Sequence, residues 1–308
     1  MSKFSSELAG RAPRVAFFTY PDWAFGSIHE ALCRELYKVG IFATILDWNA
    51  TYSHSEFDRL REVYDVFVTH PGSGVNALLK YGIPYSQIVA IAHEVSDIQS
   101  GLQHRNDFNA FKNYAVINPK LTEASAGFGI ERKPAVVQNG IHFDWYYMPP
   151  PESLRTIGYA GSVTSTMMDG VTDRKRGHLS LTLANQAGLK HSFAEGYGYR
   201  TMPMFYKSVD AVVMTSIQEA CGLPMMEAAA AGRLPVGTPV GILEQHGTFA
   251  GDILPMNEVD LVKEGANLFR YYANNRLGFR IRCSTVQDYA REHYDWSKVI
   301  EPWINAVI

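Results

Sequence analysis

The chain of 308 residues is 46% hydrophobic and 19% charged with a formal net charge of −3, a balance typical of a globular protein with room for two domains. Because it carries no strong positive field, it is not expected to bind nucleic acid. Three widely spaced cysteines indicate reduced thiols and a cytoplasmic location, and the polar amino terminus predicts no signal peptide or transmembrane segment, so membrane contact would be at most peripheral.

The chain begins with an alternation of strand and helix patterns. Strands are expected at Arg14–Thr19 and Phe42–Asp47, and apolar residues at helical spacing from Ile28 onward predict a helix between them. Gly26 lies just before that helix, where a missing side chain lets the backbone approach a ligand closely. This start favours a parallel sheet.

A glycine-rich segment follows the next expected strand, 65–69. Gly72, Gly74 and Ala77 spell Gly-x-Gly-x-x-Ala before a helix pattern, with Glu94 further on, which is the pattern of a dinucleotide site. Such a fingerprint normally follows the first strand of its domain, whereas this one follows the third. A tight turn is therefore the preferred interpretation, and an NAD(P)-dependent oxidoreductase stays open as an alternative.

Two further features close the first half. The strand Ile88–Ala92 ends in His93, which places this imidazole where parallel sheets bind ligands. The proline-rich segment 148–153 is the best linker candidate in the chain.

The second half opens with an expected strand at 156–160 that ends in Gly161 and Ser162. A long polar loop then leads to three consecutive basic residues before a helix pattern, namely Arg174, Lys175 and Arg176. The strand Lys190–Phe193 is followed by a loop that contains Gly196. Helical periodicity returns at 259–273 and 277–292, and an aromatic, amphipathic segment ends the chain.

The stretch 208–239 is the most informative part of the sequence. A buried strand at 210–214 is followed by a loop at 215–222. Pro224 then takes the first position of a helix, and helix formers continue it over 225–231. Gly232 ends the helix and Leu234–Gly237 forms the next strand. This β-loop-α-β unit makes the loop a candidate anion site, because unpaired amides and the helix dipole suit a phosphate.

Two carboxylates flank the start of this helix. Glu219 lies in the loop and Glu227 one turn inside the helix, so the pair is able to bracket a sugar nucleotide, with phosphate on the amides and ribose on Glu227. An acidic first turn that complements the helix dipole is the simpler structural interpretation.

The same stretch resembles the signature of retaining glycosyltransferases of family 4, which have the GT-B fold. The signature is a Ser, two residues and then Glu-x7-Glu, with an apolar-Pro helix start and a Gly at the helix end. The matching residues are Ser216, Glu219, Gly222, Leu223, Pro224, Glu227, Ala228 and Gly232. Ala220 and Cys221 stand where the family usually has Gly and an aromatic residue.

The resemblance implies an α/β chain of two Rossmann-like domains that face a cleft. Residues 1–147 would form the acceptor domain, 148–293 the nucleotide-sugar domain, and 294–308 a helix that returns to the first domain. Residues 136–146 resemble the segment that leaves the first domain in this family.

The resemblance also implies the roles of individual residues. Catalytic roles fall to His93, Glu219 and Arg176. Donor binding falls to Glu227, Cys221, Gly222, Leu223, Ser162, Arg174, Lys175, Gly26 and Gly196. Ser162 stands where the family has an Arg and Arg176 where it has a Lys, so Arg174 or Lys175 would supply the missing positive charge.

The implied function is metal-independent transfer of a sugar from a nucleoside diphosphate sugar to an acceptor hydroxyl with retention of configuration. The sequence contains no Asp-x-Asp metal motif, and no cofactor is expected besides the nucleotide sugar as co-substrate. Three alternatives stay open: the oxidoreductase, a non-catalytic sugar-nucleotide-binding protein, and an enzyme with Cys221 as nucleophile at a helix N-terminus.

Overall fold

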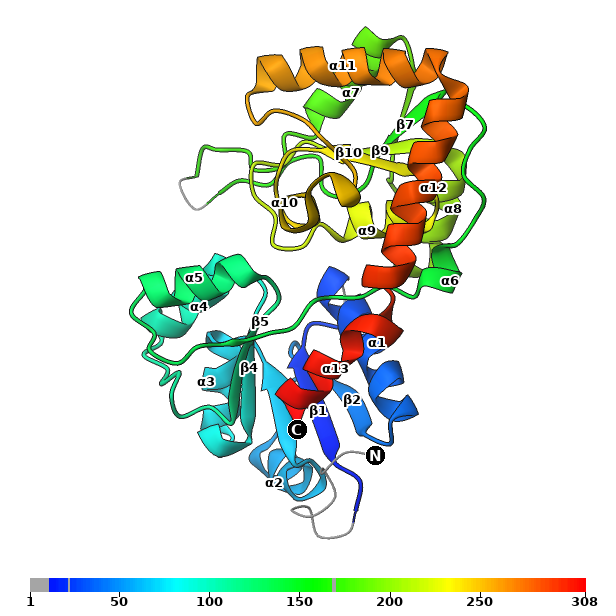
Figure 1. Ribbon diagram of the computed structural model, residues 1–308. Helices are drawn as coiled ribbons and strands as arrows, with labels where there is room; N and C mark the ends of the chain where they lie inside the picture. Colours follow the sequence, from blue (N-terminus) through cyan, green and yellow to red (C-terminus); the bar gives the residue numbers. More distant parts are fainter. Residues whose placement is uncertain (1–10, 22, 168–169) are drawn as a thin grey trace. The chain divides into compact units, whose positions relative to one another are not determined.

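The computed structural model describes residues 11–21, 23–167 and 170–308, with no account of the side chains of 23–25 (Figure 1). It divides into two compact units. Unit 1 comprises the described residues up to Gly140 together with Trp296–Ile308, and unit 2 comprises those within Ile141–Asp295. Within the described residues, no helix combines the length and the apolar character needed to cross a membrane.

Unit 1 is built on a parallel sheet with the strand order β2-β1-β3-β4-β5-β6. Its strands are β1 (Arg14–Thr19), β2 (Phe42–Asp47), β3 (Val66–Thr69), β4 (Ile88–Ala92), β5 (Asn113–Val116) and β6 (Ala135–Val136). Every residue of β3 and β4 is buried, as expected for apolar strands covered on both faces.

The helices of unit 1 follow the strands in alternation. They are α1 (Trp23–Lys38), α2 (His54–Val63), α3 (Ser73–Lys80), α4 (Val95–Gln103) and α5 (Pro119–Gly127), with the short 3-10 helix η1 (Tyr85–Gln87) before β4. Polar side chains begin three of them: Ser53 and Glu56 form a capping box on α2, Glu94 and Asp97 form one on α4, and Asn118 caps α5.

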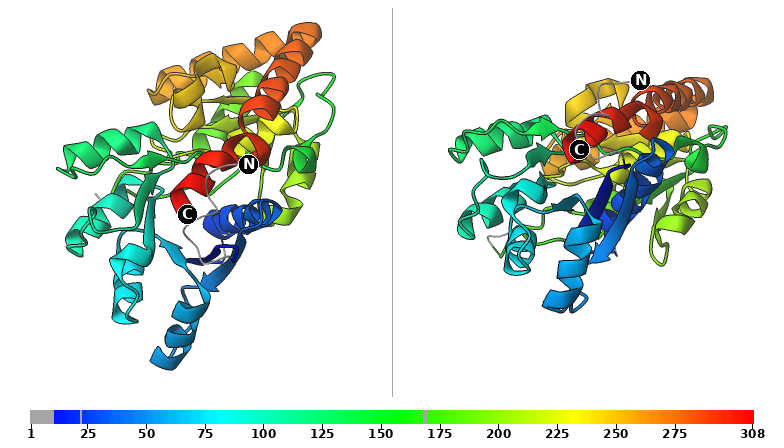
Figure 2. Two further views of the ribbon diagram at one scale, coloured as in Figure 1. Left: turned by 60° about the horizontal axis from the view of Figure 1, so that its bottom comes forward. Right: turned by 90° about the horizontal axis from the view of Figure 1, so that it is seen from below.

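The last helix, α13 (Trp296–Val307), packs on unit 1 beside α1 and against β5 and β6 (Figures 1 and 2). Its buried face contains Trp296 and Trp303, and the Trp303 indole N–H donates to the carbonyl of Gln138 at 2.7 Å. The return of the closing helix to the first unit is thus confirmed.

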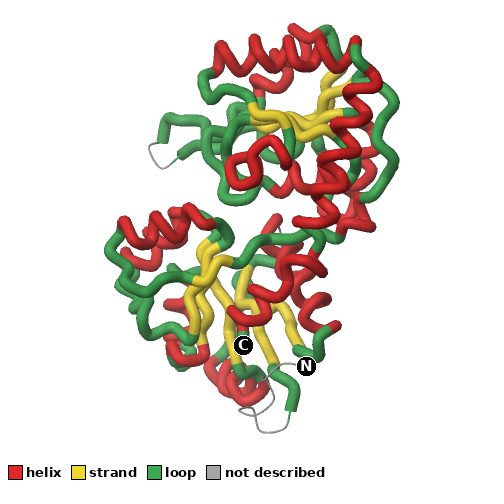
Figure 3. The backbone as a smooth tube through the Cα atoms, viewed as in Figure 1, coloured by secondary structure: helices red, strands yellow, loops and turns green. Residues whose placement is uncertain are grey.

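Unit 2 contains a second parallel sheet with the strand order β11-β10-β9-β7-β8 (Figure 3). Its strands are β7 (Thr156–Tyr159), β8 (Lys190–Phe193), β9 (Ala211–Met214), β10 (Leu234–Gly237) and β11 (Asp252–Ile253). Its helices are α6 (Phe143–Tyr146), α7 (His178–Ala187), α8 (Met202–Ser208), α9 (Leu223–Ala230), α10 (Ile242–His246), α11 (Glu258–Asn274) and α12 (Arg276–His293), with 3-10 helices η2 (Tyr199–Thr201) and η3 (Gly247–Phe249).

The division between the units falls after Gly140, a few residues before the predicted boundary at 147. Side-chain contacts explain the difference. Tyr146 in α6 donates its hydroxyl hydrogen bond to Glu227, while the carbonyls of Met148 and Pro149 accept from Gln287 and Arg233 at 2.9 and 3.0 Å. The segment from 141 through the prolines is therefore held within unit 2.

Each sheet has one point where the strand order reverses. In unit 1 the chain passes from β1 outward to β2 and then back to β3 on the other side of β1. In unit 2 it passes from β7 to β8 and then to β9 on the other side of β7. Open parallel sheets bind ligands at the carboxyl ends of their strands at such points.

Candidate functional site

The loops that follow β7 and β9 meet at the reversal point of unit 2. The Thr215 hydroxyl lies 2.8 Å from the carbonyl oxygen of Lys175 and 2.9 Å from that of Arg176. The backbone N–H of Ile217 donates to the carbonyl of Arg174 at 2.8 Å. Because these hydrogen bonds join the two loops, the basic segment and the Glu219 loop form one structure.

An ion pair between Lys175 and Glu219 connects these two loops. The Lys175 ammonium group contacts Oε1 of Glu219, and the Ser216 hydroxyl donates to the same oxygen at 2.7 Å. The side chains of Lys175 and Glu219 keep 19% and 14% of their surface exposed, so a ligand is able to reach both. The structure thus brings together the predicted residues Lys175 and Glu219.

Arg176 has a different environment from Lys175. Its side chain is buried, and its guanidinium group donates to the carbonyls of Thr215 and Met256 at 2.8 and 2.9 Å. Its backbone has a φ of 48°, in the left-handed region. Burial lowers the pKa of Arg176, which Glu258 at 3.8 Å partly opposes. The side chain therefore ties the loop after β7 to the segment that precedes α11.

The start of the basic loop is fixed by Asp173. Its Oδ1 accepts the backbone N–H of Ser165 at 2.9 Å and that of Lys175 at 3.0 Å. Burial would raise the pKa of Asp173, but these amides hold it below its ordinary value, so the carboxyl group is ionised. Arg174 donates from Nε to the Ser165 hydroxyl at 3.1 Å.

The helix that carries Glu227 begins at Leu223, so Pro224 occupies its second position, one later than predicted. Gly222 precedes it with a φ of 78°, a conformation that favours glycine. Cys221 is buried, with its sulfur 3.4 Å from that of Met226. These residues place the N-terminus of α9 next to Glu219 at the carboxyl end of β9.

Glu227 is buried with two tyrosines around its carboxyl group. Oε1 accepts the Tyr146 hydroxyl at 2.9 Å and Oε2 accepts the Tyr206 hydroxyl at 2.6 Å. Burial raises the pKa of Glu227 to about 7, although both hydrogen bonds act to lower it. The sequence analysis did not find either tyrosine, because nothing in the local pattern around them points to a carboxylate far along the chain.

The remaining donor-binding candidates of unit 2 lie in exposed loops. Ser162 follows β7, and its carbonyl accepts the Tyr159 hydroxyl at 3.0 Å. Gly196 follows β8, the neighbouring strand, with a φ of 78°. Both residues therefore stand at the carboxyl edge of the sheet, beside the loop of Lys175.

Two predicted site residues belong to unit 1. His93 directly follows β4 and is buried, with ring centroids 5.2 Å from His70 and 5.9 Å from His29. Burial, with a further contribution from His70, lowers the pKa of His93 to about 3, so its imidazole is neutral. It is thus a hydrogen-bonding group and carries no charge at neutral pH.

Gly26 lies within α1, which begins at Trp23, and not before the helix as the sequence pattern predicted. A Cβ atom at this position would lie 1.7 Å from the carbonyl oxygen of Pro21. Close packing of the chain on itself therefore accounts for a glycine here.

The glycines of the dinucleotide-like pattern are also explained by packing. A Cβ at Gly72 would lie 2.1 Å from the Ser100 hydroxyl oxygen, and one at Gly74 would lie 2.1 Å from Oγ1 of Thr69 and 2.5 Å from the Trp48 ring. Close contacts within unit 1 therefore account for both glycines without a bound pyrophosphate. Across the described residues, no three or more His, Cys, Asp or Glu side chains are grouped to hold a metal ion.

Part of the chain matches a known protein family. Residues 170–267, which include Lys175, Glu219 and Glu227, match the family model described as "Glycosyl transferases group 1". No curated protein sequence matches the chain.

Solved structures show the same fold over nearly the whole chain. HepE of Anabaena in complex with UDP and glucose has a TM-score of 0.68 at 14% identity, covering 96% of this chain and 99% of that one. Sucrose-phosphate synthase of Thermosynechococcus elongatus has a TM-score of 0.65 at 12% identity, covering 95% and 98%. The lipopolysaccharide outer core galactosyltransferase WaaB has a TM-score of 0.61 at 14% identity, covering 96% and 99%. The chain therefore has the GT-B fold, and the predicted resemblance to glycosyltransferases is confirmed by the group 1 match over 170–267.

Proposed function

We propose that this chain transfers a sugar from a nucleoside diphosphate sugar to an acceptor hydroxyl, with retained anomeric configuration and without a metal ion. The observation that carries the proposal is the pairing of Lys175 with Glu219 at the reversal point of unit 2, inside the matched segment 170–267. UDP is the first donor nucleotide to test, because HepE, which has the same fold, was solved with UDP and with UDP-glucose.

The main chemical task of the site is to stabilise the negative charge of the leaving diphosphate. When the bond between the anomeric carbon and the diphosphate oxygen breaks, negative charge develops on that oxygen. Lys175 is the cation placed to compensate it, because Arg176 is engaged by two main-chain carbonyls. The N-terminal amides of α9 add a favourable dipole.

Glu219 and Glu227 bind the two sugar groups of the donor. As Lys175 turns to the diphosphate, Glu219 is released to accept a hydrogen bond from a donor-sugar hydroxyl. Glu227 accepts ribose hydroxyls, since each carboxylate oxygen has lone pairs for a second hydrogen bond beside the one from its tyrosine. The acceptor oxygen then bonds to the anomeric carbon on the face the diphosphate leaves, and its proton passes to the departing phosphate.

The test is thermal stability against UDP, GDP, ADP, CDP and TDP and their glucose conjugates. A ligand at about a hundred times its dissociation constant adds roughly 2.7 kcal/mol to the free energy of unfolding. We expect one nucleotide series to raise the melting temperature of the wild type and to lose most of that effect in Lys175→Ala.

Lys263→Ala is the matched control, because Lys263 is exposed on α11. The shift of this control should equal that of the wild type. Release of free nucleotide from the stabilising donor, measured by a coupled assay, then separates a transferase from a protein that only binds. Stabilisation by NADH with no response to any nucleotide sugar would overturn the proposal in favour of the oxidoreductase.

A further inference from the structure

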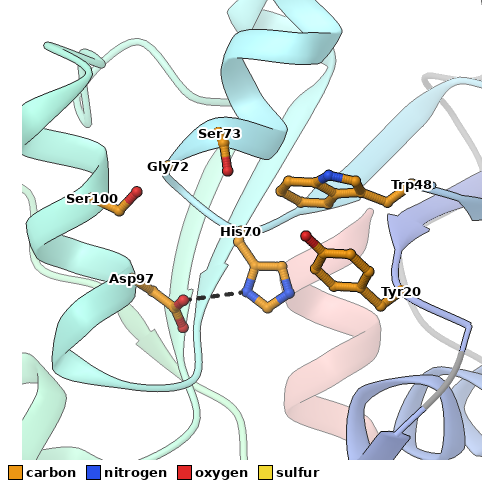
Figure 4. Close-up of a pocket in the computed structure, with 7 residues that line it drawn as sticks. All are labelled: Tyr20, Trp48, His70, Gly72, Ser73, Asp97 and Ser100. Atoms are coloured by element: carbon orange, nitrogen blue, oxygen red, sulfur yellow. Dashed lines mark ion pairs between the residues drawn. The ribbon is translucent and has the colours of Figure 1, made fainter. Parts of the chain in front are cut away.

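Unit 1 has a pocket of its own at the reversal point of its sheet (Figure 4). Tyr20 follows β1, Trp48 follows β2 and His70 follows β3, so their side chains gather at the carboxyl ends of these strands. Gly72 and Ser73 at the start of α3, with Asp97 and Ser100 on α4, complete the lining. The pocket thus occupies the place where an open parallel sheet binds its ligand.

One wall of the pocket is aromatic and rigid. The rings of Tyr20 and Trp48 are stacked with centroids 5.0 Å apart and 17° between their planes. Trp48 is also stacked on Phe18 at 5.5 Å and 8°, and the absence of a side chain at Gly74 leaves room for its ring. Figure 4 shows the Trp48 ring lying over the Tyr20 ring, with His70 next to the pair. Such a wall suits the C–H face of a sugar ring.

The other wall presents a fixed carboxylate. Oδ2 of Asp97 accepts the backbone N–H groups of His93 and Glu94 at 2.7 and 3.0 Å, while Oδ1 lies 3.5 Å from Nδ1 of His70 (Figure 4). Burial would raise the pKa of Asp97, but these groups hold it below its ordinary value. An ionised carboxylate accepts hydrogen bonds from hydroxyl groups and repels phosphates and acids.

The size of the pocket limits its ligand further. Its volume is about 160 Å³, whereas pockets for drug-sized ligands and cofactors span roughly 300–1,000 Å³. A single ring fits this space, and a dinucleotide does not.

We infer that this pocket binds one neutral pyranose ring of the acceptor, with its C–H face on the outer face of Tyr20, which Trp48 supports from behind, and its hydroxyls on Asp97. The inference rests on the proposed function in one respect: the bound pyranose is called the acceptor because a transferase would move the donor sugar onto it. It assigns recognition of the acceptor to these three side chains of unit 1.

The experiment is saturation-transfer NMR with the methyl pyranosides of glucose, galactose and mannose, beside glucuronic acid and inorganic phosphate as anionic probes. We expect at least one neutral pyranoside to bind the wild type, and Tyr20→Ala and Asp97→Asn each to weaken it by about tenfold. Tyr37→Ala, which removes the same side chain from an exposed position on α1, should leave binding unchanged.

Several results of this experiment would contradict the inference about the pocket. Absence of binding by all three pyranosides, equal binding to wild type and Tyr20→Ala, or an anion that binds and is lost in Tyr20→Ala would overturn the inference. UDP-glucose titrated into the same samples reports on unit 2 and on correct folding. A pocket that binds pyranosides in a protein that binds no nucleotide sugar would overturn the proposed function and leave the sugar site standing.

Discussion

The hydroxyl of Tyr206 lies 2.6 Å from Oε2 of Glu227, in a part of unit 2 where both side chains are buried. With Tyr146 on the other oxygen, the carboxyl group is held in one orientation before any ligand arrives. Preorganisation of this kind lowers the cost of binding, because the side chain has no rotational freedom left to lose.

Loss of the Tyr206 hydroxyl should cost stability mainly when Glu227 is ionised. Tyr206→Phe removes one of the two hydrogen bonds from a buried carboxylate, which typically costs about 1–3 kcal/mol. We expect a larger fall in melting temperature at pH 8 than at pH 6, because protonation at the lower pH removes the buried charge. Equal losses at both pH values would show that the hydroxyl acts by packing alone.

The raised pKa of Glu227 predicts a pH dependence of stability. A carboxyl group whose folded pKa is above its unfolded value binds protons better when folded, so its contribution to stability falls as pH rises from about 4.5 to about 7. Glu227→Gln lacks this titration. The melting temperature of the variant relative to wild type should therefore increase across this range and level off above it, as scanning calorimetry at several pH values would show.

The same group should link donor binding to pH. Ribose hydroxyls donate to the ionised carboxylate, so affinity for UDP-glucose should fall by about tenfold for each unit below the pKa of about 7. UDP-glucose suits the measurement because its diphosphate is esterified at both ends. Isothermal titration at pH 6 and 8 gives the ratio, and Glu227→Gln should bind more weakly with the same affinity at both. A wild type whose affinity is flat would remove Glu227 from the ribose site.

Glu219→Gln should affect UDP and UDP-glucose in opposite ways. The change removes the anionic partner of Lys175, which frees its ammonium group for the diphosphate. Affinity for UDP should therefore stay equal or increase, while turnover of UDP-glucose should fall by at least about tenfold, because a contact to the donor sugar is lost. Titration calorimetry and an assay of UDP release measure the two effects. Parallel loss of both would mean that Glu219 only holds the loop in place.

Substitution of Arg176 should mainly affect stability, and substitution of Lys175 should mainly affect nucleotide binding. Arg176→Ala removes two hydrogen bonds from a buried guanidinium group to the carbonyls of Thr215 and Met256, at a typical cost of about 1.5–3 kcal/mol each. It should lower the melting temperature by several degrees, whereas Lys175→Ala, which breaks one ion pair that keeps part of its surface exposed, should lower it less and should reduce nucleotide binding. If Arg176→Ala instead melts like the wild type and fails to bind, the arginine belongs to the donor site.

The sequence by itself determined the two parallel sheets and the elements around Glu219. Buried parallel strands read as short apolar runs, and helix ends carry Gly, Pro and capping residues, so strands such as Arg14–Thr19 and Leu234–Gly237 were predicted with their observed bounds. The motif from Ser216 to Gly232 could be recognised because its residues are close together along the chain. Its expected resemblance and fold are confirmed.

Only the tertiary structure decided which basic residue faces Glu219 and what surrounds Glu227. The resemblance assigned a catalytic role to Arg176 and left the second positive charge to Arg174 or Lys175. In the structure, backbone carbonyls hold the Arg176 guanidinium group, and Lys175 is the basic residue that contacts Glu219. Likewise, Tyr146 and Tyr206 reach Glu227 from distant segments, and Tyr20, Trp48 and Asp97 meet only because strand ends converge at one edge of the sheet. Local patterns carry backbone preference and burial, whereas side-chain partners depend on which strands the fold makes neighbours.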